Sequence, residues 1–138
     1  MKKRGFGNKK WNGVGGKPEK NESIEETAIR EAKEEIRVDI DIKNLEKVAD
    51  FKFYFTQEKK DWDQEVQIYL VKKWQGEPQE TEEMMPKWFD FDQIPYQEMW
   101  TDDKYWLPRV LKGEKLEGEF YFNKENNDFD KMDIRTKS

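Results

Sequence analysis

The chain has 138 residues, enough for one domain with a hydrophobic core. Charged residues make up 41% of it and the net charge is −5, which disfavours non-specific binding to nucleic acid or to an anionic membrane. The aromatic share of 14% is too high for a disordered chain. Cysteine and histidine are absent, so any catalysis must use carboxylates, lysines, tyrosines or a hard metal ion.

The first ten residues, MKKRGFGNKK, hold five basic side chains and no acid. Such a run is either a patch that contacts phosphates or a solvated basic terminus. No signal peptide or membrane-spanning apolar run is visible, so we expect a cytoplasmic protein. Without repeats, low-complexity tracts or linkers, residues 1–138 are expected to form a single domain, and we expect a monomer.

The secondary-structure pattern starts with a glycine-rich loop at residues 11–20. A helix is predicted over 24–36, because Ser23 and Glu26 have the spacing of a capping box. A second helix is predicted over 101–113, with Thr101 or Asp102 as N-cap and Gly113 as stop. Strands are predicted over 48–55, 65–74, 87–91, 118–123 and 129–135. The order is not strictly alternating, so we expect an α/β sandwich with a mixed sheet.

Three glutamates of the first predicted helix stand at i, i+3 and i+4, namely Glu31, Glu34 and Glu35. At about 100° per residue, Glu35 falls inside the apolar stripe, Glu31 at its edge and Glu34 about 60° further round. A carboxylate aimed at a core or cleft needs a partner, a proton or a metal. Mg²⁺ or Mn²⁺ would suit these oxygens, and the glycine loop would let backbone groups approach phosphates. A solvated helix rich in Glu and Lys is the alternative for REAKEE alone.

The longer pattern favours the metal site. Gly16, five residues, Glu22, seven residues and then Arg30-Glu31-Ala32-x-Glu34-Glu35 would arise by chance about once in a million starting positions. This pattern resembles the box of the Nudix hydrolases, which use Mg²⁺ to cleave nucleoside diphosphates linked to another group. The resemblance implies an α/β Nudix fold with a mixed β-sheet sandwiched between helices. The segments KKRGFG, WNGVGGK, EEMMP, WFDFDQIP and MWTDDKYW are similar to the 8-oxo-dGTP diphosphatases, which release a monophosphate and pyrophosphate.

The resemblance also implies roles for individual residues. Metal would be held by the carbonyl of Gly15 and by Glu31, Glu34, Glu35 and Glu83, with one of these carboxylates as the general base. The triphosphate would lie near Lys2, Lys17 and the backbone of Gly15 and Gly16. The purine pocket would use Phe6, Asn12, Met84, Trp100, Asp102 and Asp103. Arg30 and Glu22 would form an ion pair that braces the loop against the helix.

The adjacent aspartates Asp102 and Asp103 should repel each other, so the pKa of one should rise and that group should stay protonated. A carboxyl next to a carboxylate offers a donor and an acceptor, which would accept either 8-oxoguanine or 2-hydroxyadenine. The alternative is that these acids only cap the predicted helix and interact with its dipole.

Two departures from the family pattern are present. Arg37 stands where the box has glycine, and a left-handed conformation there would cost arginine about 1 kcal/mol more than glycine. We therefore expect a changed helix cap and no lost chemistry. In the family a whole strand precedes the segment that matches MKKRGFG. We therefore expect either that this chain is part of a longer gene product or that the domain lacks its usual first strand.

The resulting hypothesis is Mg²⁺-dependent hydrolysis of oxidised purine nucleoside triphosphates, such as 8-oxo-dGTP and 2-hydroxy-dATP, to sanitise the nucleotide pool. Three alternatives stay open. They are a Nudix hydrolase with another nucleotide substrate, a nucleotide-binding module with little turnover, and, least favoured by the charge, nucleic-acid binding.

Overall fold

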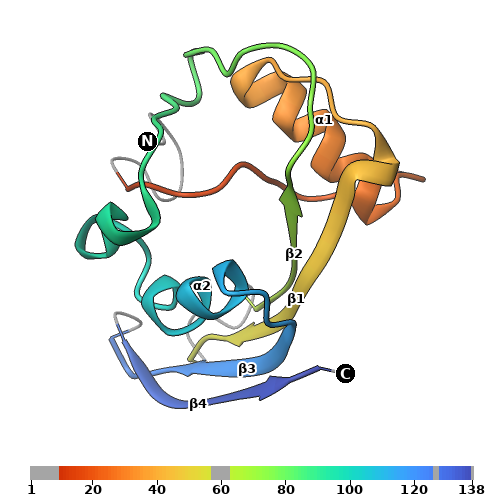
Figure 1. Cartoon of the computed structure of the whole chain (residues 1–138). Helices are drawn as coiled ribbons and strands as arrows, with labels where there is room; N and C mark the ends of the chain where they lie inside the picture. The colour runs from red at the N-terminus through yellow and green to blue at the C-terminus, as the bar shows by residue number, and fades with distance from the viewer. Residues whose placement is uncertain (1–9, 57–62, 126–127, 138) are drawn as a thin grey trace. The chain divides into compact units, whose positions relative to one another are not determined.

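The computed structural model describes residues 10–56, 63–125 and 128–137 (Figure 1). The chain divides into two compact units. The first unit is Met1–Glu46 with Leu70–Trp100, and the second unit is Lys47–Tyr69 with Thr101–Ser138. Among the described residues, no helix has the length and apolar character needed to cross a membrane.

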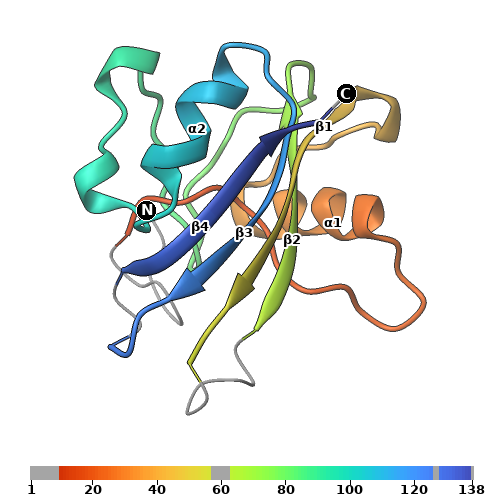
Figure 2. The same cartoon turned by 90° about the horizontal axis from the view of Figure 1, so that it is seen from below.

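A four-stranded sheet forms most of the second unit. Its strands are β1 (Leu45–Tyr54), β2 (Gln64–Val71), β3 (Leu116–Phe122) and β4 (Phe129–Thr136). Their order across the sheet is β2-β1-β3-β4 (Figure 2). Since β1 pairs with β3 in parallel and β3 pairs with β4 antiparallel, the predicted mixed sheet is confirmed.

Aromatic side chains fill the core of the second unit. Phe51 of β1 and Phe120 of β3 are fully buried, and their ring centroids lie 5.3 Å apart. Phe53, two residues further along β1, stacks on Phe120 at 4.9 Å, as expected when alternate residues of a strand share a face. Trp106 of helix α2 (Asp103–Leu111) lies 5.6 Å from Phe51. Helix α2 therefore packs on this face of the sheet.

Helix α1 (Ile24–Ile36) in the first unit has the predicted bounds. The predicted capping box is present, because Ser23 and Glu26 each accept a 3.1 Å hydrogen bond from the other's backbone N–H. The helix ends at Ile36, and its C-cap Arg37 has φ 66° and ψ 30°, so the left-handed cap is kept and the expected change of cap is wrong. Arginine therefore occupies a backbone position that favours glycine.

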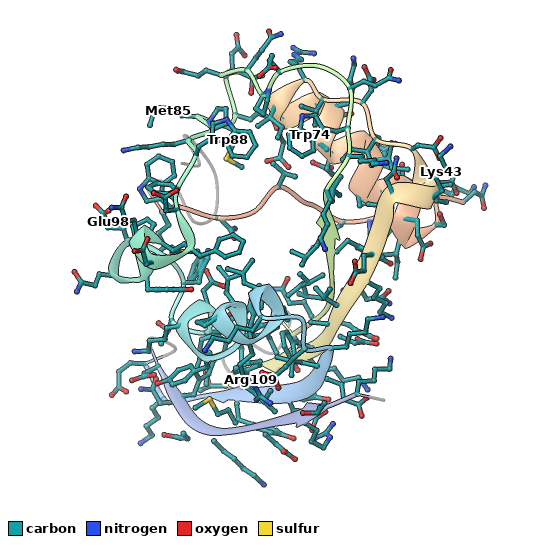
Figure 3. The ribbon with its side chains drawn as sticks, viewed as in Figure 1. Lys43, Trp74, Met85, Trp88, Glu98 and Arg109 are labelled. Carbon is teal, nitrogen blue, oxygen red and sulfur yellow. The ribbon has the colours of Figure 1, made fainter. Side chains whose placement is uncertain are left out.

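The strand predicted over 87–91 is wrong. These residues form no strand, and a short 3-10 helix begins at Phe91 and ends at Gln93. A strand needs a neighbour for its backbone hydrogen bonds, which an alternating aromatic pattern cannot supply. Trp88 is instead 70% exposed and stacks on Trp74, which follows the end of β2, with ring centroids 5.8 Å apart (Figure 3).

Other short elements complete the first unit. Two further 3-10 helices are η1 (Ile42–Asn44) and η4 (Tyr96–Glu98). The backbone of Trp11 donates to the carbonyl of Glu98 at 2.8 Å, which ties the start of the glycine loop to η4. The bridge between Asp39 and Gln75 joins the chain that leaves α1 to the segment after β2.

Candidate active site

The three glutamates of α1 differ in exposure as the helical wheel predicts. The residue Glu35 is 4% exposed, whereas the side chains of Glu31 and Glu34 are 15% and 52% exposed. The amide N–H of Gly15 donates to Oε1 of Glu35 at 3.0 Å. The glycine loop therefore lies directly against the most buried carboxylate of the helix.

The buried carboxyl group of Glu35 holds protons more tightly than an ordinary glutamate. Burial is the main cause, and together with Glu31 and Glu83 it raises the pKa of Glu35 from 4.5 to about 7. The hydrogen bond from Gly15 opposes this rise. The side chain of Glu31 lies within hydrogen-bonding distance of Glu35, while Glu83 acts through its charge. Glu31 and Glu35 are therefore poised to share a proton or a cation.

Arg30 joins the helix to the loop through Glu22, as predicted. Its Nε and one terminal nitrogen bind the two carboxylate oxygens of Glu22 at 2.8 and 3.1 Å. This pairing lowers the pKa of Glu22 to about 2 and raises the pKa of Arg30 well above its ordinary value. The same guanidinium also donates to the backbone carbonyl of Lys17 at 3.2 Å. Arg30 therefore braces both ends of the loop segment 17–22.

The same arginine also neutralises two of the candidate metal ligands. Its other terminal nitrogen lies 2.8 Å from Oε1 of Glu31 and 3.2 Å from Oε2 of Glu34. Within the described ranges no three acidic side chains meet closely enough to enclose an ion. The structure thus brings Glu31 and Glu35 together, with Glu83 close enough to influence Glu35, and turns Glu34 towards Arg30.

The residues nonetheless fit a hard divalent cation. Two carboxyl groups in contact repel each other unless a proton or a cation lies with them. Gly16 leaves room at this place, since a Cβ atom on it would lie 2.6 Å from Oε1 of Glu31. Carboxylate oxygens beside an open backbone are the donor set that Mg²⁺ and Mn²⁺ prefer. The metal-ligand roles of Gly15, Glu31, Glu34, Glu35 and Glu83 stay predictions.

Residues 79–84 carry Glu83 and contact the C-terminal end of α1. The hydroxyl of Thr81 donates to the carbonyl of Glu35 at 2.7 Å, and the amide of Gln79 donates to the carbonyl of Ile36 at 2.8 Å. Thr81 was not among the residues predicted for the site. Its only local signal was its position two residues before Glu83, where a threonine hydroxyl can accept a backbone N–H.

The two predicted base-reading aspartates lie at the start of α2 in the second unit. Asp103 is buried, and its side chain hydrogen-bonds to that of Asp102. Asp102 occupies the N-cap position but makes no capping hydrogen bond, and its Oδ2 accepts from the indole N–H of Trp106 at 2.7 Å. The capping alternative therefore does not describe this carboxylate. Trp106 was not among the predicted site residues either, although its place four residues after Asp102 is a signal of such a contact.

The pKa of Asp102 is raised, as predicted for one of the pair, but for a different reason. Burial is the main cause, whereas the hydrogen bonds that Asp102 accepts from Trp106 and from Asp103 lower the pKa. Repulsion between the two carboxylates is not among the causes. The pair can therefore hold a proton because it is removed from water.

The remaining predicted pocket residues differ in their surroundings. Lys2 and Phe6 lie outside the described residues. Asn12 and Lys17 are exposed, and Oδ1 of Asn12 accepts from the amide of Gly13 at 2.9 Å. Met84 is 3% exposed. Trp100 is half-buried, and the ammonium of Lys10 lies 5.5 Å from the centre of its ring, a cation–π contact that the sequence analysis missed.

Comparison with known proteins places the chain in a family. The model of the NUDIX domain matches residues 1–110. The oxidized purine nucleoside triphosphate hydrolase of Danio rerio is 45% identical over 122 residues, which cover 88% of this chain and 76% of the relative. The protein of the same name from Mus musculus is 43% identical over 126 residues, which cover 91% of this chain and 78% of the relative.

A solved structure agrees with these relatives. The mutator MutT protein from Bacillus halodurans superposes with a TM-score of 0.73 and 26% identity, over 88% of this chain and 79% of that one. The family is indicated by the matched fold, by the glutamates of α1 and by the two similar hydrolases. The chain belongs to the Nudix family.

Proposed function

We propose that this protein is a Mg²⁺-dependent hydrolase that converts oxidised purine nucleoside triphosphates to the monophosphate and pyrophosphate. The observation that carries the proposal is the contact of Glu31 with the buried Glu35, beside the open backbone of Gly16. The two curated relatives, both oxidized purine nucleoside triphosphate hydrolases, supply the substrate class.

Mg²⁺ would be held by Glu31, Glu34, Glu35 and Glu83 and by the carbonyl of Gly15. When bound, the ion supplies neutralisation of phosphate charge and polarisation of a phosphoryl oxygen. Mn²⁺ suits the same oxygen donors. Glu34 would have to leave the guanidinium of Arg30, 3.2 Å away, to take part. Arg30 would keep its two bonds to Glu22, which hold the loop in place.

A carboxylate of this cluster would accept a proton from the attacking water, because the chain has no histidine. In metal-free protein the pKa of Glu35 is raised to about 7, mainly by burial. The positive charge of an ion would lower that pKa, so Glu35 would be charged when it acts as a ligand. Glu31, which lies beside Glu35, is an equal candidate for the base.

The resemblance to the family assigns purine binding to several residues. The ring of Trp100 offers a face for stacking on a base. Asp102 and Asp103, if they share one proton, offer a donor and an acceptor to the base edge. The raised pKa of Asp102 supports that assignment. Asn12, Phe6 and Met84 would also contact the purine, and Lys2 and Lys17 would lie near the triphosphate.

The test is release of pyrophosphate and monophosphate from 8-oxo-dGTP and from dGTP in Mg²⁺ buffer, with Glu35→Gln as the control. We expect strong preference for the oxidised nucleotide and no turnover by the variant. Similar turnover of both nucleotides would contradict the substrate class and leave a Nudix hydrolase of another nucleotide. Binding without turnover by the folded wild type would favour a nucleotide-binding module.

A further inference from the structure

The C-terminal end of α1 leaves backbone carbonyls that the helix cannot satisfy, as every helix does. The carbonyl of Glu35 accepts a hydrogen bond from the hydroxyl of Thr81, which lies 46 residues away in sequence. The carbonyl of Ile36 accepts a hydrogen bond from the amide of Gln79. The hydroxyl bond is 2.7 Å long and partly buried. A side chain from a distant loop thus caps the helix at the residue whose carboxylate faces the glycine loop.

The hydroxyl of Thr81 has a second bond on its other side. The amide of Glu83 donates to Oγ1 of Thr81 at 3.3 Å, and the amide of Thr81 donates to the carbonyl of Met84 at 2.9 Å. These bonds close the backbone around residues 81–84 into a tight turn. One oxygen atom is therefore bonded both to the backbone of Glu35 and to the backbone of Glu83.

The negative charges of Glu83, Glu35 and Glu31 would drive the loop 81–84 away from the end of α1. Glu83 lies close enough to Glu35 for its charge to raise the pKa of that group, and Glu31 has the same effect. Like-charged carboxylates that approach each other without a cation repel. The hydroxyl of Thr81, which is bonded to the backbone of each residue, opposes that repulsion and keeps the acids at a fixed spacing before any ion binds.

We propose that Thr81 is a positioning residue, whose hydroxyl holds the loop of Glu83 against the end of α1 and so sets the place of Glu83 relative to Glu31 and Glu35. The proposal rests on the proposed function, because it assigns these acids to one metal site. Only a hydroxyl performs this role, since the position needs a donor towards Glu35 and an acceptor for Glu83. Serine retains both capacities and valine retains neither.

The test compares the Mn²⁺ affinity of Thr81→Val and Thr81→Ser with that of the wild type. Protein is titrated with Mn²⁺ without nucleotide, and free Mn²⁺ is measured by electron paramagnetic resonance. Groups that orient ligands typically change metal affinity by roughly 10–100-fold when lost. We expect a loss in that range for Thr81→Val and near wild-type affinity for Thr81→Ser. Unchanged affinity in Thr81→Val, when the wild type binds Mn²⁺, would overturn the proposal.

Two controls separate positioning from stability. Thr136→Val removes a threonine hydroxyl in β4 that accepts from Arg109 at 3.4 Å, and Val110→Ala removes buried volume in α2. We expect both to bind Mn²⁺ like the wild type, even where the melting temperature falls. If Val110→Ala loses affinity as much as Thr81→Val does, the effect is one of stability and Thr81 is not a positioning residue.

A second measurement needs no metal. Hydrogen exchange of the Glu83 amide in metal-free protein should quicken in Thr81→Val and not in Thr81→Ser, because that amide donates to the hydroxyl. Unchanged exchange would contradict the proposed bond. Failure of the wild type to bind Mn²⁺ would instead refute the metal site itself, and the proposed function with it.

Discussion

The backbone of Gly16 lies so close to the carboxylate of Glu31 that a Cβ atom there would stand 2.6 Å from Oε1 and 2.7 Å from Cδ. Real Cβ atoms do not approach that closely, so a larger residue at position 16 must displace the carboxylate. The glutamate side chain is flexible at its end and can move. The glycine therefore sets where the Glu31 carboxylate can lie.

We accordingly expect Gly16→Ala to fold and to lose activity. Misplacing a catalytic group by about 1 Å typically costs roughly 10²-fold in rate. Gly13→Ala is the matched control in the same loop, because a Cβ at Gly13 meets nothing within 4 Å. The measurements are kcat/KM with Mg²⁺ and the melting temperature. Equal activity of the two variants would show that Glu31 is not held by this contact.

The raised pKa of Glu35 predicts how metal-free protein responds to pH. Between the ordinary value of 4.5 and the folded value of about 7, the folded state binds more protons than the unfolded state. The free energy of unfolding must therefore fall as pH rises through this window, by the contribution of this one group. Below 4.5 both states are protonated, and the folded protein keeps the full benefit.

Glu35→Gln should remove that contribution, because glutamine does not titrate. Thermal unfolding of both proteins in a chelator, from pH 4 to pH 8, should show the wild type losing stability relative to the variant as pH rises. Addition of Mg²⁺ should restore more stability to the wild type at pH 8 than at pH 5, since protons compete with metal. A constant difference between the two proteins across this range would contradict the raised pKa.

Elements of the fold that are marked by residues close together in sequence could be predicted from the sequence, and those that depend on distant residues could not. The bounds of α1 were correct because Ser23 and Glu26 mark its start within four residues and the apolar period of 3.6 marks its face. The different exposures of its glutamates followed from the same period. The strand predicted over 87–91 failed because pairing with another strand is a long-range property, and its aromatics are used differently, as in the stack of Trp88 on Trp74.

In the candidate site, too, the contacts that depend on residues far apart in sequence could not be predicted. The pair of Glu22 with Arg30 could be predicted from the box, because the family pattern already contains it. The bond from Thr81 to the carbonyl of Glu35 could not, since it joins residues far apart in sequence and uses a backbone atom that carries no sequence signal. The cause of the raised pKa of Asp102 also needed the structure, because burial cannot be read from two adjacent aspartates.

Arg37 offers a test of the helix end. Its φ of 66° is the left-handed conformation, in which glycine avoids the steric cost of a Cβ atom. We expect Arg37→Gly to raise the free energy of unfolding by about 1 kcal/mol. Arg37→Ala, which keeps the Cβ atom, should give no such gain. Urea denaturation of the three proteins measures this, and an equal gain in both variants would assign it to the arginine side chain instead.

The hydrogen bond from the indole of Trp106 should stabilise the charged form of Asp102. Trp106→Phe keeps an aromatic ring against Phe51 and removes the indole N–H, so a partly buried carboxyl loses its donor at 2.7 Å. The cost should be about 1–3 kcal/mol in the free energy of unfolding. Because this bond lowers the pKa of Asp102, its loss should raise that pKa further.

The sign of the pH effect follows from that change. The charged form of Asp102 loses more than the neutral form, so the deficit of Trp106→Phe relative to the wild type should be largest at high pH. It should shrink as pH falls and Asp102 takes up its proton. Trp88→Phe, which alters an exposed tryptophan, is the matched control and should show little deficit at any pH. Titration of the Asp102 carboxyl carbon by NMR measures the shift directly, and the same pKa in Trp106→Phe and wild type would mean that the indole does not stabilise the charged form.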